Sequence, residues 1–232
     1  MARVSTFGMV MLILIMPLTG CTGITSGITG SSDNEEISVP TWEIGDYWLY
    51  TFSTPDYSDD TTRLVVATTD IEEQGTAYML AISSIGEARR HAVLNHNPFL
   101  GRITHEGLSP FENGEAKNVL DFPLTKNKAW SFSLFDNEWN AVVSSIDSSI
   151  ASIRAMTNDG STIDYIFDGN LAFFSSFIWT DAEGITQLKM KNADQGIGHT
   201  GDVYFVRGGD LYSNNWYNTG PDAEFVDTFL VS

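Results

Sequence analysis

Cysteines and basic side chains are both scarce in this chain of 232 residues. The single cysteine excludes an internal disulfide framework, and a chain of this length can bury a sizeable core without one. Only 12 Lys and Arg side chains oppose 30 Asp and Glu, which leaves a net charge of −18. Nucleic-acid binding needs clustered Lys and Arg at the phosphates, so the composition argues against a nucleic-acid partner. General solvation in a saline medium accounts for the acidic excess.

Long apolar runs are also missing. A helix that spans a bilayer needs about 20 apolar residues, and no run of that length is present. The most apolar segment, Phe7 to Met16, has ten residues, which is typical of the hydrophobic region of a secretory signal peptide. The residues Leu18-Thr19-Gly20-Cys21 follow it, and they contain the only cysteine of the chain. This tetrapeptide resembles the lipobox of prokaryotic lipoproteins.

The resemblance implies that residues 1–20 are a signal peptide and that Cys21 carries a lipid as the first residue of the mature protein. In an archaeon the lipid would be an ether analogue. Each buried CH₂ contributes about 0.8 kcal/mol, so two chains on one cysteine hold a protein stably at a membrane. Residues 22–40 are rich in Gly, Ser and Thr and then acidic. They have too few apolar side chains for a core, so residues 21–40 are predicted to form a flexible tether.

Residues 41–232 are predicted to form a single β-rich domain. Trp48, Tyr50 and Phe52 alternate with other residues, as in a strand with one buried face. Turn signals such as Asp159-Gly160 separate the short apolar runs. Such runs lie at 62–68, 76–84, 88–95, 117–122, 139–146, 150–156, 162–167, 171–180, 185–190 and 202–206. The expected fold is all-β, an antiparallel meander forming a curved sheet, barrel or sandwich, with little helix beyond the signal peptide.

Two features of this body stay open. Residues 221–231 fit a helix with Pro221 at its first position, and they fit a closing strand over 226–231 equally well. The pattern of residues 48–70 returns in residues 130–147, which is consistent with two quasi-repeats of about 80 residues or with chance.

Motifs for catalysis, metals and cofactors are weak. The sequence contains no G-x-S-x-G, P-loop or Cys–His pair, so no catalytic residue, metal ligand or cofactor is predicted. Residues 196–201 match G-x-G-x-x-G, but a polar segment precedes them and a strand-like run follows, so a loop between strands is expected. Asp194, Asp202 and Asp210 flank this loop and offer oxygen ligands for Ca²⁺. Their spacing matches neither an EF-hand loop nor a β-roll loop, and solvated turn residues are the preferred interpretation.

A basic island stands out within residues 87–106 of this acidic chain. It is a candidate site for an anionic ligand such as a phosphate, sulfate or uronate, and cross-strand pairing with surrounding acids is the preferred alternative. The candidate residues are Arg89, Arg90, His91, Arg102 and His105.

A group of aromatic residues in a polar segment forms a second candidate surface, consisting of Tyr212, Trp216 and Tyr217. Such side chains can stack on a sugar or form a protein interface. The preferred alternative is a cap over an open end of the β-structure, with the polar tips in water.

The segment Asp121-Phe122-Pro123-Leu124, followed by Trp130, is similar over a few residues to β-rich envelope lipoproteins with a half-barrel. That resemblance implies a cradle for a lipid or small molecule, and residues 171–179, apolar on both faces, suit such a cavity. The expected function is therefore non-catalytic binding of a small molecule, lipid or glycan by an extracytoplasmic lipoprotein held at the membrane through Cys21. The alternatives are an envelope scaffold or protein-interaction module, and a hydrolase with an unrecognised site.

Replacing Cys21 tests the anchor. In cells that express the full chain, Cys21→Ser is expected to move the protein from the membrane fraction to the soluble extracytoplasmic fraction, because serine lacks the thiol that carries the lipid. Thr25→Ser in the tether is the control and should stay with the membranes until detergent is added. A Cys21→Ser protein that sediments with membranes would contradict lipidation at this residue.

Overall fold

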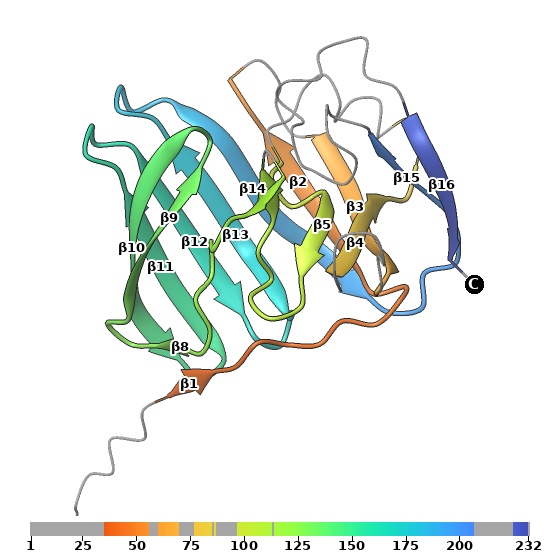
Figure 1. The fold of residues 1–232 in the computed structure, drawn as a ribbon, viewed down its shortest axis with the longest axis horizontal. Helices are drawn as coiled ribbons and strands as arrows, with labels where there is room; N and C mark the ends of the chain where they lie inside the picture. Colours follow the sequence, from red (N-terminus) through yellow and green to blue (C-terminus); the bar gives the residue numbers. More distant parts are fainter. Residues whose placement is uncertain are drawn as a thin grey trace, which may run out of the picture. The chain divides into compact units, whose positions relative to one another are not determined.

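The computed structural model describes residues 35–55, 60–69, 77–84, 86, 97–112, 114–206 and 225–231. Every named element in these ranges is a strand, and all the strand pairs are antiparallel (Figure 1). The prediction of an all-β antiparallel protein is therefore confirmed. The strands are β1 (Glu36–Ile37), β2 (Tyr47–Ser53), β3 (Asp60–Thr68), β4 (Ala77–Ile82), β5 (Gly101–Thr104), β6 (Phe111–Glu112), β7 (Glu115–Ala116), β8 (Leu124–Thr125), β9 (Ala129–Leu134), β10 (Asn137–Asp147), β11 (Ile150–Met156), β12 (Thr162–Asp168), β13 (Phe173–Thr180), β14 (Thr186–Gly196), β15 (Gly201–Val206) and β16 (Phe225–Val231).

One large sheet of twelve strands dominates the unit formed by Asn34–Ser232. Its order is β16-β15-β4-β3-β2-β14-β13-β12-β11-β10-β9, and β5 also pairs with β4. Strands β2 to β5 form one meander and β9 to β14 form a second, and pairing of β14 with β2 joins them. The order ends at β9 and β16, so the sheet is open rather than closed into a barrel. The segment between β5 and β9, which carries β6 to β8, runs across one face of it (Figure 1).

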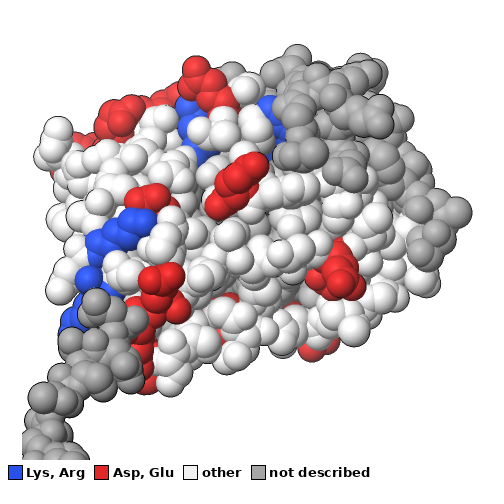
Figure 2. Space-filling view, turned by 60° about the horizontal axis from the view of Figure 1, so that its bottom comes forward, with Lys and Arg blue, Asp and Glu red and all other residues white. Residues whose placement is uncertain are grey.

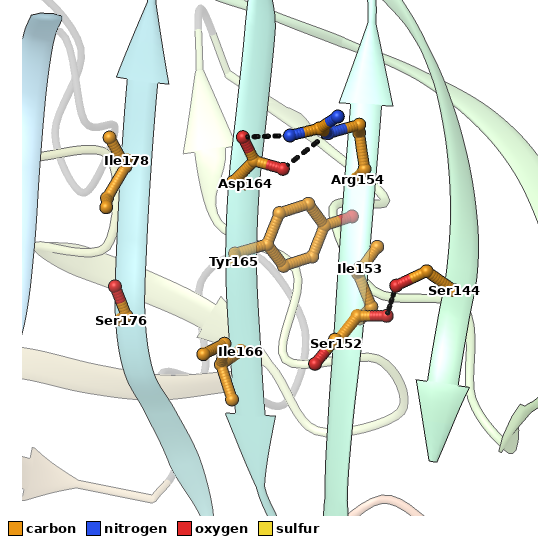
Figure 3. Close-up of a pocket in the computed structure, with 9 residues that line it drawn as sticks. All are labelled: Ser144, Ser152, Ile153, Arg154, Asp164, Tyr165, Ile166, Ser176 and Ile178. Atoms are coloured by element: carbon orange, nitrogen blue, oxygen red, sulfur yellow. Dashed lines mark hydrogen bonds and ion pairs between the residues drawn. The ribbon is translucent and has the colours of Figure 1, made fainter.

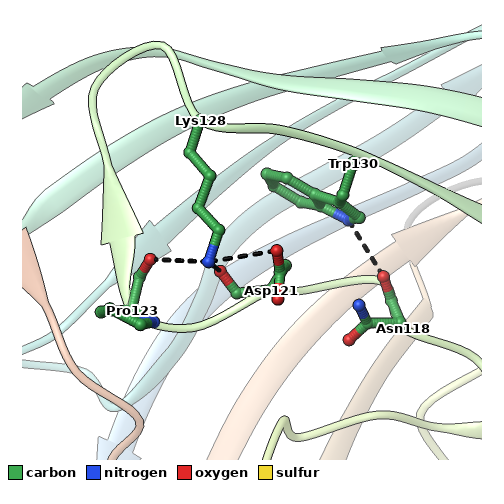
Figure 4. Close-up of polar contacts among 5 residues, drawn as sticks. All are labelled: Asn118, Asp121, Pro123, Lys128 and Trp130. Carbon is green, nitrogen blue, oxygen red and sulfur yellow. Dashed lines mark hydrogen bonds and ion pairs between the residues drawn. The ribbon is translucent and has the colours of Figure 1, made fainter.

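Segment 117–122, predicted to be a strand, is irregular (Figure 4). Side-chain donors, rather than the N–H groups of a neighbouring strand, form hydrogen bonds with its carbonyl groups. The Lys128 ammonium donates to the carbonyl oxygen of Asp121 at 2.6 Å and also pairs with its carboxylate at 3.1 Å. The indole nitrogen of Trp130 donates to the carbonyl oxygen of Asn118 at 3.0 Å. Because these donors satisfy the backbone, the segment can cover the core without strand pairing.

The C-terminal segment is a strand, which decides between the two interpretations of residues 221–231. Strand β16 pairs with β15, with Val231 opposite Gly201. The two segments of the suggested repeat, β2–β3 and β9–β10, both form antiparallel hairpins with apolar side chains packed against the core. A duplication of about 80 residues stays a prediction. The expected strand at 88–95 lies outside the described residues.

Aromatic rings fill the main core between the sheet and the segment that crosses it. Phe173 is fully buried, and its ring centroid lies 5.0 Å from that of Trp42, 5.2 Å from that of Trp48 and 5.5 Å from that of Phe99. Edge-to-face and tilted contacts of this kind are favourable beyond the burial of apolar area alone.

The polar atoms of these core aromatics are hydrogen-bonded to backbone carbonyl groups around the start of β13. The donors are Trp42 Nε1 to Ala172 O at 2.9 Å, Trp48 Nε1 to Leu171 O at 2.8 Å, and Tyr50 Oη to Phe174 O at 2.5 Å. Burial raises the pKa of Tyr50 well above its ordinary value, because the phenolate would lose its hydration. The core phenol therefore stays a neutral donor.

A smaller core lies on the opposite face of β3 and β4. Its buried members are Val65, Ala67, Met79, Ala81, Val203 and Val231. Strands β3 and β4 therefore contribute buried side chains to two cores, whereas β10 to β13 are covered on one face and leave the other available.

Truncating the ring at the centre of the main core tests this packing. Phe173→Ala is expected to lower the free energy of unfolding by about 3–5 kcal/mol, because it removes buried contacts and leaves a cavity. Urea unfolding followed by tryptophan fluorescence measures the change. Ile185→Ala, at a side chain in the turn before β14 that is 51% exposed, should change it by less than about 0.5 kcal/mol. Equal losses for the two variants would contradict a core centred on Phe173.

Candidate functional site

A hollow of about 380 Å³ lies on the face of β10 to β13 that points away from the main core (Figure 3). We call it the outer groove. Two of its lining residues, Ile153 and Tyr165, are buried and belong to the main core beneath it. The residues that line the outer groove are Ser144, Ser152, Ile153, Arg154, Asp164, Tyr165, Ile166, Ser176 and Ile178.

The strand register places these side chains in two rows that cross the strands. Arg154 lies opposite Asp164, which lies opposite Ile178. Ser152 lies opposite Ile166, which lies opposite Ser176, one step further along the strands. Directly opposite residues have Cβ atoms about 5 Å apart, so each row presents a nearly continuous line of side chains.

Two β-bulges border this arrangement. The register of β10 against β11 shifts between Val143 and Ser145, and the hydroxyl of the intervening Ser144 donates to the carbonyl oxygen of Ser152 at 2.9 Å. A second shift, between Ile166 and Phe167, interrupts the pairing of β12 with β13. Bulges bend a strand and re-aim its side chains, and they occur often near functional sites.

Arg154 and Asp164 form a two-point ion pair at one end of the outer groove (Figure 3). Arg154 Nε donates to Asp164 Oδ1 at 2.6 Å, and Nη2 donates to Oδ2 at 2.9 Å. The hydrogen bond to the carboxylate raises the pKa of Arg154. Both side chains are about half exposed, at 57% and 45%, so the pair adds little to stability. Its two-point geometry instead holds polar atoms in fixed positions beside the isoleucines.

The G-x-G-x-x-G motif is a loop between strands, as predicted. It begins at Gly196, the last residue of β14, and reaches Gly201, the first residue of β15. No helix follows to meet a pyrophosphate, so this is not the dinucleotide-binding arrangement. A hollow of about 260 Å³ lies beside the loop, lined by Asp46, Tyr47, Trp48, Asn170, Leu171, Ala172, Gln195, Gly196 and Ile197.

Two close approaches explain why Gly196 and Gly45, at and near this loop, carry no side chain. A Cβ atom on Gly196 would lie 2.5 Å from Cζ of Tyr47, so the ring packs directly over the glycine. Gly45 has φ of +88°, and a Cβ there would lie 2.9 Å from the carbonyl oxygen of His199. The glycines thus serve close packing of the loop on β2.

His199 lies within this loop, near Arg63. Its Nε2 is buried and has no hydrogen-bond partner among the described residues. Burial lowers the pKa of His199, and repulsion from the Arg63 guanidinium lowers it further. A neutral imidazole is therefore favoured.

Two of the five residues of the basic island are described, and both pack against aromatic rings. The Arg102 guanidinium lies 3.4 Å from the centroid of the Phe111 ring, and Arg102 is only 4% exposed. The His105 ring lies 4.1 Å from that of Tyr78. Arg102 thus makes a buried cation–π contact rather than presenting an open cationic surface. Arg89, Arg90 and His91 lie outside the described residues, as do Tyr212, Trp216, Tyr217 and Cys21.

Charged side chains form small separate groups on the face shown in Figure 2, and uncharged side chains cover most of its described surface. Among the described residues, no three His, Cys, Asp or Glu side chains are arranged to hold a metal ion. Asp194 and Asp202 belong to this part of the chain, and Asp210 lies outside it. No helix within the described ranges has the length and apolar character needed to cross a membrane.

Comparison with known proteins adds no relative, because no family model, curated protein or solved structure matches the chain.

The outer groove was not predicted from the sequence. Its signal lies in β11 to β13, where Ser, Arg, Asp and Ile occupy the positions that alternate with the core residues. Residues 171–179, expected to be apolar on both faces, bury phenylalanines on one side, whereas Ser176 and Ile178 line the groove on the other.

A double substitution tests the contact between the glycine-rich loop and β2. Gly196→Ala is expected to lower the free energy of unfolding by about 1–3 kcal/mol, because the new methyl group overlaps the Tyr47 ring. In a Tyr47→Ala background the same change should cost much less, and urea unfolding of the four proteins measures the coupling. Gln195→Ala, at the preceding exposed residue, is the control. Equal costs of Gly196→Ala in both backgrounds would show that the ring is not the obstacle.

Proposed function

We propose that this chain is an extracytoplasmic lipoprotein, anchored through Cys21, whose β-body binds a ligand non-catalytically in the outer groove. The single observation that carries the binding role is the outer groove itself, a concave surface with hydroxyl, apolar and paired ionic side chains on a rigid support. Ligand sites are characteristically concave, with a few polar groups placed among apolar ones.

The support beneath the groove favours recognition of a ligand without rearrangement. Ile153 and Tyr165 anchor its floor in the main core, and the Tyr165 hydroxyl donates to the carbonyl oxygen of Val119 at 2.9 Å. Side chains on such regular strands keep their positions better than side chains on loops. The proposed ligand therefore meets a surface that is already in place.

The chemistry of the groove favours binding over catalysis. Its nine lining residues include no histidine or cysteine. The carboxylate and the guanidinium that it presents, on Asp164 and Arg154, are joined to each other at 2.6 and 2.9 Å. Acid–base and nucleophilic catalysis require a group poised to exchange a proton or attack. A carboxylate fixed on an arginine is better suited to positioning a ligand.

A protein-interaction module is the second candidate, because exposed apolar side chains flank the groove on the same face. Val142 lies opposite Arg154 and is 38% exposed, and Met156 at the end of β11 is 47% exposed. Exposed apolar side chains that gather on one face are a feature of protein interfaces. The experiment below separates a protein partner from a small ligand or glycan.

Native mass spectrometry of the full chain, extracted from its own envelope in detergent, tests the binding role. A retained mass beyond those of the polypeptide and its anchor is expected. Ser176→Trp should abolish retention, because the indole would fill the groove from β13. Ser133→Trp is the matched control, since Ser133 is a half-buried residue of β9 that does not line the groove. It should leave retention unchanged.

The possible outcomes separate the two candidates. A non-protein mass lost only in Ser176→Trp supports ligand binding in the groove. A second polypeptide lost only in Ser176→Trp would replace ligand binding by the interaction module. A bare anchored polypeptide in every sample would contradict the outer groove as the binding site. So would a ligand mass that the Ser176→Trp variant retains as well as the wild type does.

A further inference from the structure

Two lysines extend the outer groove along its β14 side. Lys189 lies opposite Ile178, and Lys191 lies opposite Ser176, so each is the direct cross-strand neighbour of a lining residue. Leu188 and Met190 alternate with them and are buried in the main core. Both lysines therefore project from the outer face beside the groove.

Both lysines are exposed, and neither has an ion-pair partner among the described residues. Three other cations on this body do have carboxylate partners: Lys117 with Glu115, Lys128 with Asp121 and Arg154 with Asp164. The side chains of Lys189 and Lys191 start about 7 Å apart on one strand, and their like charges repel. In a chain with 30 acidic residues and 12 basic ones, two adjacent cations without a partner in the described part of the chain favour binding of an external anion.

Hydroxyl groups continue beyond the lysines onto β2. Thr51 lies opposite Lys191, and Ser53 lies opposite Lys189. Thr61 on β3 lies opposite Thr51 in turn. One row of outward side chains thus crosses six strands in the order Ser152, Ile166, Ser176, Lys191, Thr51, Thr61. At about 4.8 Å per strand, this row is roughly 24 Å long.

Building on the proposed function, we propose that the ligand is an anionic glycan chain that lies across the strands, with its acidic groups on Lys189 and Lys191. Interior strands use their backbone groups in the sheet, so an extended peptide would have to add at an edge. A ligand on this face has to bind through side chains alone. Serine and threonine hydroxyls match sugar hydroxyls, and Ile166 and Ile178 offer apolar contact to the C–H faces of sugar rings.

The charges in the outer groove and on the lysine pair favour an acidic chain over a neutral one. Asp164, the groove carboxylate, is neutralised by Arg154 at 2.6 Å, so it does not repel an anion next to it. The lysine charges lie two strands further along the same face. They are exposed and have no ion pair with any described residue, and they can donate charge-assisted hydrogen bonds to carboxylate or sulfate oxygens.

Titration of the full chain in detergent with matched polysaccharides tests the inference. The acidic probes are polygalacturonate and dextran sulfate, and the neutral counterparts are fully methyl-esterified polygalacturonate and dextran. Calorimetry is expected to show binding of an acidic probe and at least about tenfold weaker binding of its neutral counterpart. The double variant Lys189→Gln/Lys191→Gln should bind the acidic probe about tenfold more weakly than the wild type does. Added salt should reduce this difference in affinity.

Lys126→Gln is the control for charge alone. Lys126 is exposed in the turn before β9, and four strands of the sheet separate β9 from β14. Its replacement should leave the affinity within about twofold, and thermal unfolding should show that all variants fold.

Each result bears on one proposal or on both. Neutral and acidic chains that bind equally, and that Ser176→Trp blocks, would overturn the anionic preference and leave the outer groove as a ligand site. An affinity for the acidic probes that is unchanged in Lys189→Gln/Lys191→Gln would also overturn the inference. Absence of binding by all four probes would overturn glycan recognition, and the native mass spectrum then decides whether the groove holds another ligand or a protein.

Discussion

Aromatic donors near the start of the folded body hold the carbonyl groups around the start of β13, and the main core is organised around these hydrogen bonds. Trp48 reaches Leu171 over a sequence separation of 123 residues, and Trp42 reaches Ala172 over 130. Each bond satisfies a buried indole N–H and a backbone carbonyl group, and leaving such groups unpaired would cost about 1–3 kcal/mol each. Polar bonding thus fixes which residues of the turn before β13 face the core, and aromatic packing around Phe173 fills the space between them.

That filled interior makes the outer face suitable for binding. In β12, Ile163, Tyr165 and Phe167 enter the main core, so Asp164 and Ile166 must point the other way. The strand is held by its buried side and by ladders on both edges. The outward side chains are therefore positioned by the sheet without contributing much to its stability. Recognition and folding use alternate residues of the same strands, so the two can be changed separately.

The sequence was most informative where a strand has one buried face and one exposed face. The run 150–156 is β11 residue for residue, and the loop at 196–201 was recognised because a strand-like run follows it. Segment 117–122 was wrongly expected as a strand, because its apolar residues enter the core while Lys128 and Trp130 bond its carbonyl groups. The outer groove was missed because it depends on register. Alternation does not reveal that Ser176 lies opposite Ile166 across a bulged pair.

Joining β14 to β2 has a consequence for the order in which the chain becomes structured. Whether it folds during synthesis or as it emerges across a membrane, the chain presents β2 to β5 first, and the strand that completes the other edge of β2 follows more than a hundred residues later. Until then β2 has one open edge, and its tryptophan and tyrosine lack the carbonyl groups that they bond in the finished protein. Contacts of such long range slow folding and leave strand edges open to wrong partners. The early half of the sheet thus passes through a vulnerable stage, in which solubility depends on its acidic side chains and on any chaperone present.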